Sequence, residues 1–451
     1  MARFLVGTIP VIGHVNPALP IARTLVERGH DVWWYTGKAF QTKVEAIGAH
    51  FVPIKTGFDL TDPTSLLTEL LAKQNSLTGL AQFKFGFKYL FGDSAVAQVK
   101  DYLEILKQFP ADVMLADVCF LGAAWTHEQG GPAWATLGVT PLAITSNDTA
   151  PFGLAMPPAT SVLGRLRNNC LNWLFQQILA KDLTVYLNTL RASLGLPPDS
   201  QFFFDSVVSP YLYLQTTVSG FEYPRRNLPP QLHFIGPVLT EPPTEFVPPR
   251  WWNDLKSSKP VVHVTQGTVA TEASDLLIPT LQALAEEEVL VVATTGGQPI
   301  DAIALDSLPA NVRLEPFIPH SCLLPHVDVM VTNGGYNGTH MALAFGVPMV
   351  AAGQTEEKPE VCARIAWSQV GIDLRTKTPT PTQIRTAVKQ MLSEPHYREN
   401  AQGLQAEIAR CNTVSLAIDL LEQLAMTKEP VIAQQPDLLF INSIGSGLAF
   451  K

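Results

Sequence analysis

The first part of the chain alternates short apolar runs with stretches in which apolar residues recur at helical spacing. Residues 3–8 form an apolar run typical of a buried strand, and residues 9–17 are rich in proline and glycine, which predicts a loop. Apolar residues three and four apart predict a helix over 18–28, ended by Gly29. Residues 31–36 predict the next strand. A strand–helix–strand unit of this length predicts parallel strands joined by a right-handed crossover.

The same rhythm recurs further along the chain. A strand over 111–117, a helix over 123–129 and a strand within 132–140 continue the first region. After residue 252 the pattern predicts helices over 276–287 and 339–345, and strands at 260–266, 289–295, 328–333 and 348–353. Alternating strands and helices of this kind are typical of parallel α/β sheets.

A proline-rich stretch divides the two regions. Residues 237–252 contain five prolines, which favour extended backbone and predict a linker. We therefore expect a domain over 1–236, a second over 253–425, and a tail or peripheral strand over 426–451. The fold class is α/β, with two doubly wound, Rossmann-like parallel-sheet domains facing a cleft.

Composition excludes several classes of protein. Of the 451 residues, 46% are hydrophobic, so the chain can bury large cores. A net charge of −9 disfavours general nucleic-acid binding, which depends on neutralising phosphates. The five cysteines are scattered without metal-ligand spacing, as in reduced cytosolic proteins. The apolar N-terminus is too interrupted for a signal peptide, and no apolar run reaches the ~20 residues that span a bilayer. We expect a cytoplasmic protein, with a monomer as the working assumption.

Two residues are candidates for proton transfer. His14 follows the first strand, at the sheet edge where α/β proteins bind ligands, and histidine can take up a proton near neutral pH. Asp117 closes the strand over 111–117 and could hold the other imidazole nitrogen. The alternatives are a structural histidine and an aspartate that caps the next helix. Asp112 competes as partner, but lies at the start of its strand.

A glycine-rich turn in the second region is a candidate anion site. Gly334, Gly335 and Gly338 lie between a predicted strand and helix, where backbone amides and the helix N-terminus favour a diphosphate. The alternative is a tight turn that needs glycine only for packing. The P-loop and GxGxxG patterns are absent. No D-x-D pair occurs, so a metal-bridged diphosphate is not expected.

With these motifs in order, the sequence resembles the family-one glycosyltransferases, the UDP-glycosyltransferase group with the GT-B fold. The resemblance covers residues 1–425 and is strongest over 3–36 and 311–375. It implies that His14 is the catalytic base and Asp117 its orienting partner. Residues 314–339 resemble the donor-binding signature, and residues 354–358 the segment that grips the donor sugar. The implied donor contacts are Thr268, Phe317, Ile318, His320, Asn333, Gly335, Asn337, Gly338, Thr339, Glu357 and Lys358.

In this family Phe317 would pack on the nucleotide base, Ile318 would offer backbone bonds and Thr268 would contact phosphate. Three positions depart from the family pattern. Asn333 replaces the histidine that contacts phosphate, and Glu357-Lys358 replaces an acidic residue followed by glutamine, which leaves the sugar open. Met341 replaces the glutamate that binds the ribose hydroxyls, so a dTDP-sugar becomes an alternative to the expected UDP-hexose.

The resemblance implies an inverting, metal-independent transfer to a hydroxyl of an apolar small molecule, with the nucleotide sugar as co-substrate and no other cofactor. Aromatic segments of the first domain would line the acceptor pocket, and we name Phe83, Phe87, Phe152 and Met156. The alternative for these residues is ordinary core packing. One alternative is a non-catalytic helper protein, which would lack the candidate base or the glycine-rich turn, and the sequence contains both. A nucleotide-sugar epimerase would alter UDP-glucose without any acceptor.

Overall fold

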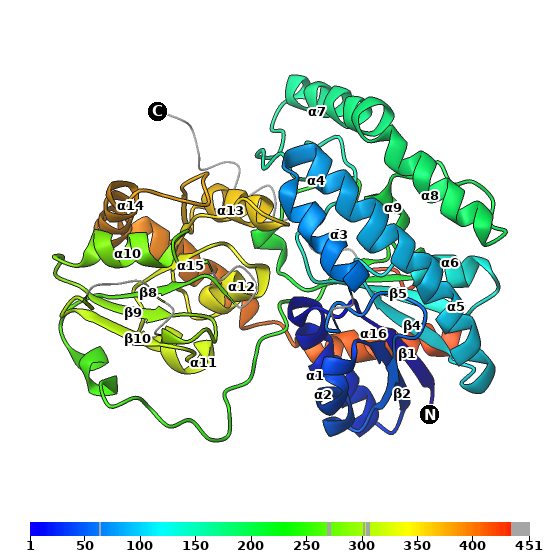
Figure 1. Cartoon of the computed structure of the whole chain (residues 1–451), viewed down its shortest axis with the longest axis horizontal. Helices are drawn as coiled ribbons and strands as arrows, with labels where there is room; N and C mark the ends of the chain where they lie inside the picture. The colour runs from blue at the N-terminus through cyan, green and yellow to red at the C-terminus, as the bar shows by residue number, and fades with distance from the viewer. Residues whose placement is uncertain (63–64, 268–271, 301–302, 304–306, 434–451) are drawn as a thin grey trace.

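The computed structural model of the protein describes residues 1–62, 65–267, 272–300, 303 and 307–433. Thr268, one of the predicted phosphate contacts, lies outside these residues. The chain forms two parallel sheets, each flanked by helices, that lie side by side (Figure 1). The expected fold class, two doubly wound parallel-sheet domains, is confirmed.

The first sheet contains seven strands in the order β3-β2-β1-β4-β5-β6-β7, all paired in parallel. The strands are β1 (Arg3–Gly7), β2 (Asp31–Thr36), β3 (His50–Pro53), β4 (Val113–Asp117), β5 (Ala133–Gly138), β6 (Leu212–Gln215) and β7 (Leu232–Phe234). Strand order reverses between β1 and β4, which is where ligands bind in open α/β sheets.

The second sheet has the order β10-β9-β8-β11-β12-β13, again parallel throughout. Its strands are β8 (Val261–Thr265), β9 (Leu290–Thr294), β10 (Val312–Glu315), β11 (Val329–Thr332), β12 (Met349–Ala351) and β13 (Gly371–Asp373). The reversal here lies between β8 and β11. Both domains therefore present a ligand-binding edge of the same kind.

Helices cover both faces of each sheet. The first-domain helices are α1 (Ile12–Glu27), η1 (Lys38–Phe40), α2 (Gln41–Ala46), α3 (Ser65–Ser76), α4 (Gly79–Phe85), η2 (Gly86–Gly92), α5 (Asp93–Gln108), α6 (Gly122–Glu128), α7 (Val162–Leu174), η3 (Phe175–Leu179), α8 (Lys181–Ser193), α9 (Phe203–Ser206) and η4 (Ser219–Phe221). Those that follow are η5 (Trp252–Lys256), α10 (Leu277–Leu284), α11 (His320–Leu323), η7 (Leu324–His326), α12 (Tyr336–Ala344), α13 (Lys358–Trp367), α14 (Pro381–Ser393), α15 (Pro395–Ile408) and α16 (Thr413–Thr427). In the described part of the chain, none is both long and apolar enough to cross a membrane.

The two faces of the first sheet bury separate cores. Phe4 and Val6 of β1 belong to the core that also contains α1, whereas Leu5 belongs to the core on the opposite face. Successive side chains of a strand point to opposite faces, so a strand covered on both sides is apolar throughout. This explains why uninterrupted apolar runs predicted the strands correctly.

The last helix returns to the first domain. We predicted that the second domain extends to residue 425, but α16 packs its apolar face into the first-domain core (Figure 1). Arg28 at the end of α1 donates hydrogen bonds to Asp419 at 2.7 Å and Glu422 at 2.8 Å. Beyond α16, the amide of Val431 donates to Tyr211 O at 2.8 Å, so the start of the tail lies against the first domain.

Two further boundaries differ from the prediction. The stretch 9–17, predicted as a loop because of its prolines, is helical from Ile12, with Pro17 and Pro20 inside α1. The helix predicted at 339–345 begins one turn earlier, at Tyr336. Both shifts have the same consequence, because they place predicted site residues in the first turns of helices rather than in loops.

Candidate active site

The first-domain edge brings His14 and Asp117 together. Asp117 ends β4 with a fully buried side chain, and its Oδ1 lies 3.0 Å from His14 Nδ1. Backbone amides fix the carboxylate, because Ile9 N donates to Oδ2 at 2.6 Å and Cys119 N donates to Oδ1 at 2.7 Å. An aspartate held in this way fixes the orientation of the imidazole and leaves Nε2 to accept a proton.

Proline chemistry explains a contact beside His14. Pro17 has no N–H, so the carbonyl of Gly13, four residues earlier in α1, lacks its usual helical donor. Asn337 of the second domain donates its side-chain amide to that carbonyl at 3.2 Å. The helix that carries His14 is therefore tied directly to the glycine-rich turn of the other domain.

The surroundings of His14 favour its charged form. Burial by itself lowers the pKa of His14, whose side chain is 15% exposed. The charge of Asp117, its hydrogen bond and the charge of Glu357 outweigh burial, so the pKa is raised above its ordinary value of 6.5. An imidazole with this pKa takes up a proton readily near neutral pH.

Asp112 lies at the opposite end of β4 and has a different task. Its carboxylate accepts a hydrogen bond from Arg3 N at 2.8 Å and lies 3.5 Å from Lys428 Nζ. These contacts hold the pKa of Asp112 below its ordinary range, although partial burial acts in the opposite direction. In this geometry Asp117, at the carboxyl end of the strand, contacts His14, whereas Asp112 contacts Arg3 and Lys428.

Cys119 completes a group of three potential metal-ligating side chains. Its thiol, Asp117 and His14 place their ligand atoms within 4.8 Å of one another. Burial, together with the charges of Asp117 and Glu357, raises the pKa of the Cys119 thiol well above its ordinary value. The carboxylate already accepts bonds from the imidazole and two amides. The arrangement is that of a hydrogen-bonded dyad beside a neutral thiol.

The second-domain edge is built around Asn333, which follows β11. Its side-chain amide donates to the carbonyl of Gln266, directly after β8, at 2.5 Å. Asn333 thus joins the two strand ends at the reversal point of the second sheet. The side-chain amide that we expected to contact phosphate donates to a backbone carbonyl instead.

The glycine-rich turn leads into α12. Gly334 has φ +79°, and a Cβ there would lie 2.6 Å from the sulfur of Cys362, so this position requires glycine. Gly335 is the N-cap, where a Cβ would meet only Asn333 Oδ1, at 3.9 Å, and Asn337, Gly338 and Thr339 fall within the first turns. Thr339 is fully buried, and its hydroxyl has no hydrogen-bond partner among the described residues. The geometry is that of a helix N-terminus able to face an anion.

The segment after β10 presents one exposed aromatic ring. Phe317 is 63% exposed, whereas Ile318 is buried and can offer only its backbone. His320 begins α11, and its ring meets that of His263 edge-on at 5.5 Å. Burial lowers the pKa of His320 to about 4, so this side chain is neutral at physiological pH. Phe317 is thus available for stacking, and His320 adds no charge.

Residues 354–358 lead into α13. Glu357 is the N-cap of this helix, and its charge acts on His14 of the first domain. The ammonium of Lys358 is nearly buried and pairs with the carboxylate of Glu356, a residue with φ +52°. Met341, at the position of the expected ribose-binding glutamate, is 6% exposed and packs in the second-domain core. No carboxylate is present at that point.

Comparisons with known proteins place this chain in a family. Residues 279–422 match the family model described as "Erythromycin biosynthesis protein CIII-like, C-terminal domain". The chain is 46% identical to the 4'-demethylrebeccamycin synthase of Lentzea aerocolonigenes, over 94% of this chain and 99% of that one. It is 33% identical to UDP-glycosyltransferase 2 of Phaeomoniella chlamydospora, over 93% and 95% of the two chains.

The chain belongs to the family-one glycosyltransferases. A solved calicheamicin glycosyltransferase shares the fold, with a TM-score of 0.71 at 22% identity over 95% of this chain and 100% of that one. The protein is therefore a GT-B glycosyltransferase of the natural-product type that uses a nucleotide-sugar donor, as the sequence resemblance implied.

The aromatic residues predicted to line the acceptor pocket of this glycosyltransferase converge on one ring. Phe204 in α9 lies 6.1 Å from Phe83, 5.4 Å from Phe87 and 5.1 Å from Phe152, measured between ring centroids. Phe83 and Phe87 also pack on the first-domain core, so pocket lining and core packing both describe them. Phe204 was not predicted, although the run of phenylalanines at 202–204 could have drawn attention to it.

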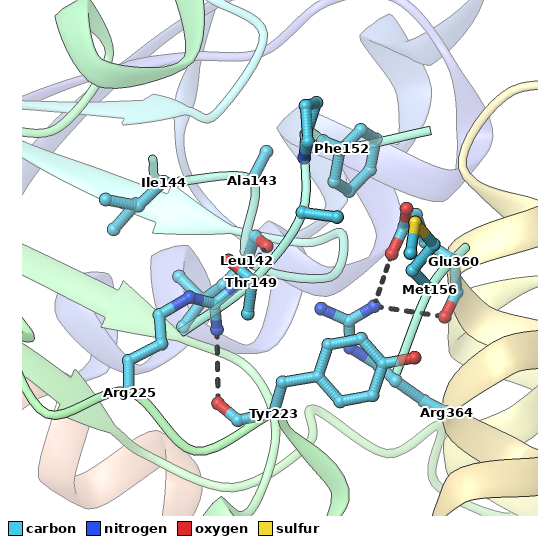
Figure 2. A pocket seen from close by; sticks show the side chains of 12 residues that line it. Leu142, Ala143, Ile144, Thr149, Phe152, Met156, Tyr223, Arg225, Glu360 and Arg364 are labelled. Carbon is cyan, nitrogen blue, oxygen red and sulfur yellow. Dashed lines mark hydrogen bonds and ion pairs between the residues drawn. The ribbon is translucent and has the colours of Figure 1, made fainter. Parts of the chain in front are cut away.

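Phe152 and Met156 line a small pocket at the domain junction (Figure 2). Its free volume is about 10 Å³, which is roughly the space of a single water molecule. Arg364 and Glu360 of α13 close it from the second domain, and the guanidinium of Arg364 lies 4.1 Å from the ring centre of Tyr223. Neither residue was predicted, because their first-domain partners lie far away in the chain.

Proposed function

We propose that this glycosyltransferase transfers a sugar, with inversion and without a metal, from a nucleotide diphosphate sugar to a hydroxyl of an apolar small molecule. The observation that supports this most directly is the pair formed by His14 and Asp117, with the carboxylate fixed by two backbone amides. Metal independence remains an expectation based on the absent D-x-D pair and the helix N-terminus of the cradle.

In the proposed reaction His14 accepts the proton of the acceptor hydroxyl on Nε2. Asp117 holds the proton on Nδ1 and stabilises the imidazolium that forms. The oxygen attacks the anomeric carbon from the side opposite the nucleotide, the C–O bond to the diphosphate breaks, and the configuration inverts. General-base assistance of this kind contributes about 10²–10⁴ in rate.

The leaving diphosphate would face the N-terminus of α12. Gly335 is the N-cap with no side chain in the way, and the amides of the first turn point outward from the helix. The partial positive charge of a helix N-terminus stabilises the charge that develops on the leaving group. Asn337 contacts the carbonyl of Gly13, so the same turn lies beside the base.

The donor proposed is a UDP-hexose, with a dTDP-sugar as the alternative. Several relatives are named UDP-glucosyltransferases, which favours UDP. Met341 provides no acceptor for ribose hydroxyls, which removes one reason for preferring a ribonucleotide. Exposed Phe317 could stack on either base.

An apolar acceptor fits the cluster around Phe204 and agrees with the relatives, one of which is named for a rebeccamycin product. Acceptor pockets of this kind are mainly apolar, with a few polar groups that set orientation.

A donor panel read by thermal shift tests the proposal first. UDP, dTDP and their glucose conjugates are added at increasing concentrations, since a ligand at ~100 times its dissociation constant stabilises by about 2.7 kcal/mol. The best donor is then incubated with a set of aromatic acceptors, and NMR of the product gives the anomeric configuration. Retained configuration would contradict the proposed mechanism, and altered sugar without any acceptor would favour an epimerase.

A further inference from the structure

A buried ionic network joins the two domains through α13. Arg364 donates to Glu222 of the first domain from Nε at 2.9 Å and from Nη2 at 2.6 Å. Its Nη1 also donates to Glu360, one turn earlier in α13, at 3.0 Å. All three side chains are at most 6% exposed. Buried ion pairs of this kind are weak evidence for stability, so we consider which segments of the chain they hold in place.

Glu360 also holds a loop of the first domain. Its Oε1 accepts hydrogen bonds from Gly153 N at 2.7 Å and Ala155 N at 2.9 Å. Ala155 has φ +51°, a conformation that a non-glycine residue adopts only when its surroundings impose it. This loop, residues 148–159, is closed by a bond from Ala159 N to Asp148 O at 2.7 Å. It carries Phe152 and Met156, two of the predicted acceptor contacts.

The beginning of α13 belongs to the segment that we expect to contact the donor sugar. Its N-cap is Glu357, three residues before Glu360, and the charge of Glu357 helps to raise the pKa of His14. Residues 354–358 form the segment expected to contact the donor sugar. One helix therefore begins in the segment expected to contact the donor sugar and places Glu360, in its first turn, on the 148–159 loop, with Arg364 anchoring it to Glu222.

We propose that Glu360 and Arg364 are positioning residues that make the acceptor pocket depend on the donor. A donor that holds residues 354–358 holds α13, and α13 holds the 148–159 loop through Glu360. Donor binding then favours the formed pocket, and by reciprocity an acceptor strengthens donor binding. This inference rests on the proposed function, because it takes residues 354–358 and the 148–159 loop as the donor and acceptor sides.

Hydrogen–deuterium exchange of the full chain tests the link without an acceptor. The peptide containing Gly153 and Ala155 is followed with and without saturating UDP-glucose or dTDP-glucose. In the wild type the donor should slow exchange of this peptide. Glu360→Ala should speed its exchange at least tenfold and abolish the donor's effect, because both amides lose their acceptor.

Two further variants separate positioning from general damage. Glu360→Gln keeps a carbonyl oxygen for the two amides and should preserve most of the protection. The matched control is Glu407→Ala, since Glu407 also accepts a first-domain amide, from Gly220 at 3.1 Å, but lies on α15. It should leave the loop peptide and the donor's effect unchanged.

The outcomes distinguish the two proposals. If neither glucose conjugate binds the wild type, as read by thermal shift, the proposed donor function fails and the coupling fails with it. If a donor binds but the loop peptide exchanges equally in its presence and absence, only the coupling is overturned. Equal loss of protection in Glu360→Ala and Glu407→Ala would also overturn it, because the loop would then respond to any weakening of the domain contact.

Discussion

The two domains have the same kind of strand reversal, but the residues at the two edges differ in how firmly they are held by hydrogen bonds. Between β1 and β4, His14 and Asp117 meet, and the aspartate is bound by an imidazole and two amides. Between β8 and β11, Asn333 is bound to Gln266 O, the buried hydroxyl of Thr339 has no hydrogen-bond partner within the part of the chain that the structure describes, and Phe317 is exposed. The first edge therefore has the fixed geometry expected of a catalytic base, whereas the second has groups that a ligand would have to engage.

This contrast has a physical reason. A base must hold its geometry before the transition state, because reorganisation at that moment costs rate. A binding surface can rearrange, since ligand contacts offset the cost of ordering. The comparison predicts that mutations at the first edge lower the turnover rate. It also predicts that exchanging the nucleotide of the donor changes donor binding only modestly.

The largest expected effect comes from removing the base. His14→Ala should lower the transfer rate by about 10²–10⁴ and leave UDP or dTDP binding nearly unchanged, because the glycine-rich turn expected to bind the donor lies in the other domain. Steady-state kinetics and thermal shift measure the two effects. Cys119→Ser, which alters a neighbour but keeps the amide that binds Asp117, is the control. A His14→Ala enzyme within a few-fold of wild type would disprove the assignment.

The second-largest effect should come from weakening Asp117, the expected partner of the base. Asp117→Asn should lower kcat by about 10² or more and raise the acceptor KM much less, because orientation and imidazolium stabilisation act in the transition state. Asp112→Asn, on the same strand but at its far end, should change kcat by only a few-fold. The strand-end argument would be wrong if Asp112→Asn were the more damaging substitution.

The pH profile sharpens the same comparison. His14 must be neutral to accept a proton, and its pKa is raised above 6.5 because Asp117 and Glu357 outweigh burial. Activity should therefore rise with pH through a midpoint above 6.5 in kcat/KM. Asp117→Asn removes the charge that favours the imidazolium, so the midpoint should move to lower pH. A midpoint that stays in place or moves upward would show that another group titrates.

The donor edge should discriminate weakly between nucleotides. With Met341 in the core and no glutamate at the ribose position, kcat/KM for a UDP-sugar and its dTDP counterpart should differ by less than about tenfold, or ~1.4 kcal/mol. Competition between the two donors in one reaction gives the ratio directly. A hundredfold preference for UDP would mean that another residue recognises the ribose.

The smallest expected effect is that of a chelator. Transfer should continue in EDTA at its original rate, since the N-terminus of α12 is expected to stabilise the diphosphate without a cation. Mg²⁺ added afterwards should change nothing. Activity lost in EDTA and regained with Mg²⁺ would show that the cleft recruits a metal, with Asp117 and Cys119 the first residues to examine.

Much of the architecture could be predicted because buried parallel strands are apolar on both faces. The strands that end at Asp117 and before Asn333 were predicted within one or two residues, which placed both ligand-binding edges. The start of α1 was predicted wrongly, because Pro17 suggested a loop. A proline inside a helix leaves a carbonyl unbonded, and here Asn337 satisfies it from more than 300 positions away.

The network of Glu222, Glu360 and Arg364 could not be predicted for a related reason. Glu222 and Arg364 are 142 positions apart, and no local pattern indicates that they meet. The placement of α16 is similar, because its apolar face would suit the core of either domain. Local spacing predicts elements, whereas pairing across a domain junction depends on the assembled fold.

The return of α16 also has a practical consequence for engineering. The first domain is discontinuous in sequence, so the polypeptide crosses between domains once near residues 237–252 and again between α15 and α16. A chimera that exchanges the donor half at a single junction would transplant a helix selected to fit another protein's acceptor half. A chimera should instead exchange the residues from the linker through α15, which make up the second domain. It then retains the native α16 and its ion pairs with Arg28.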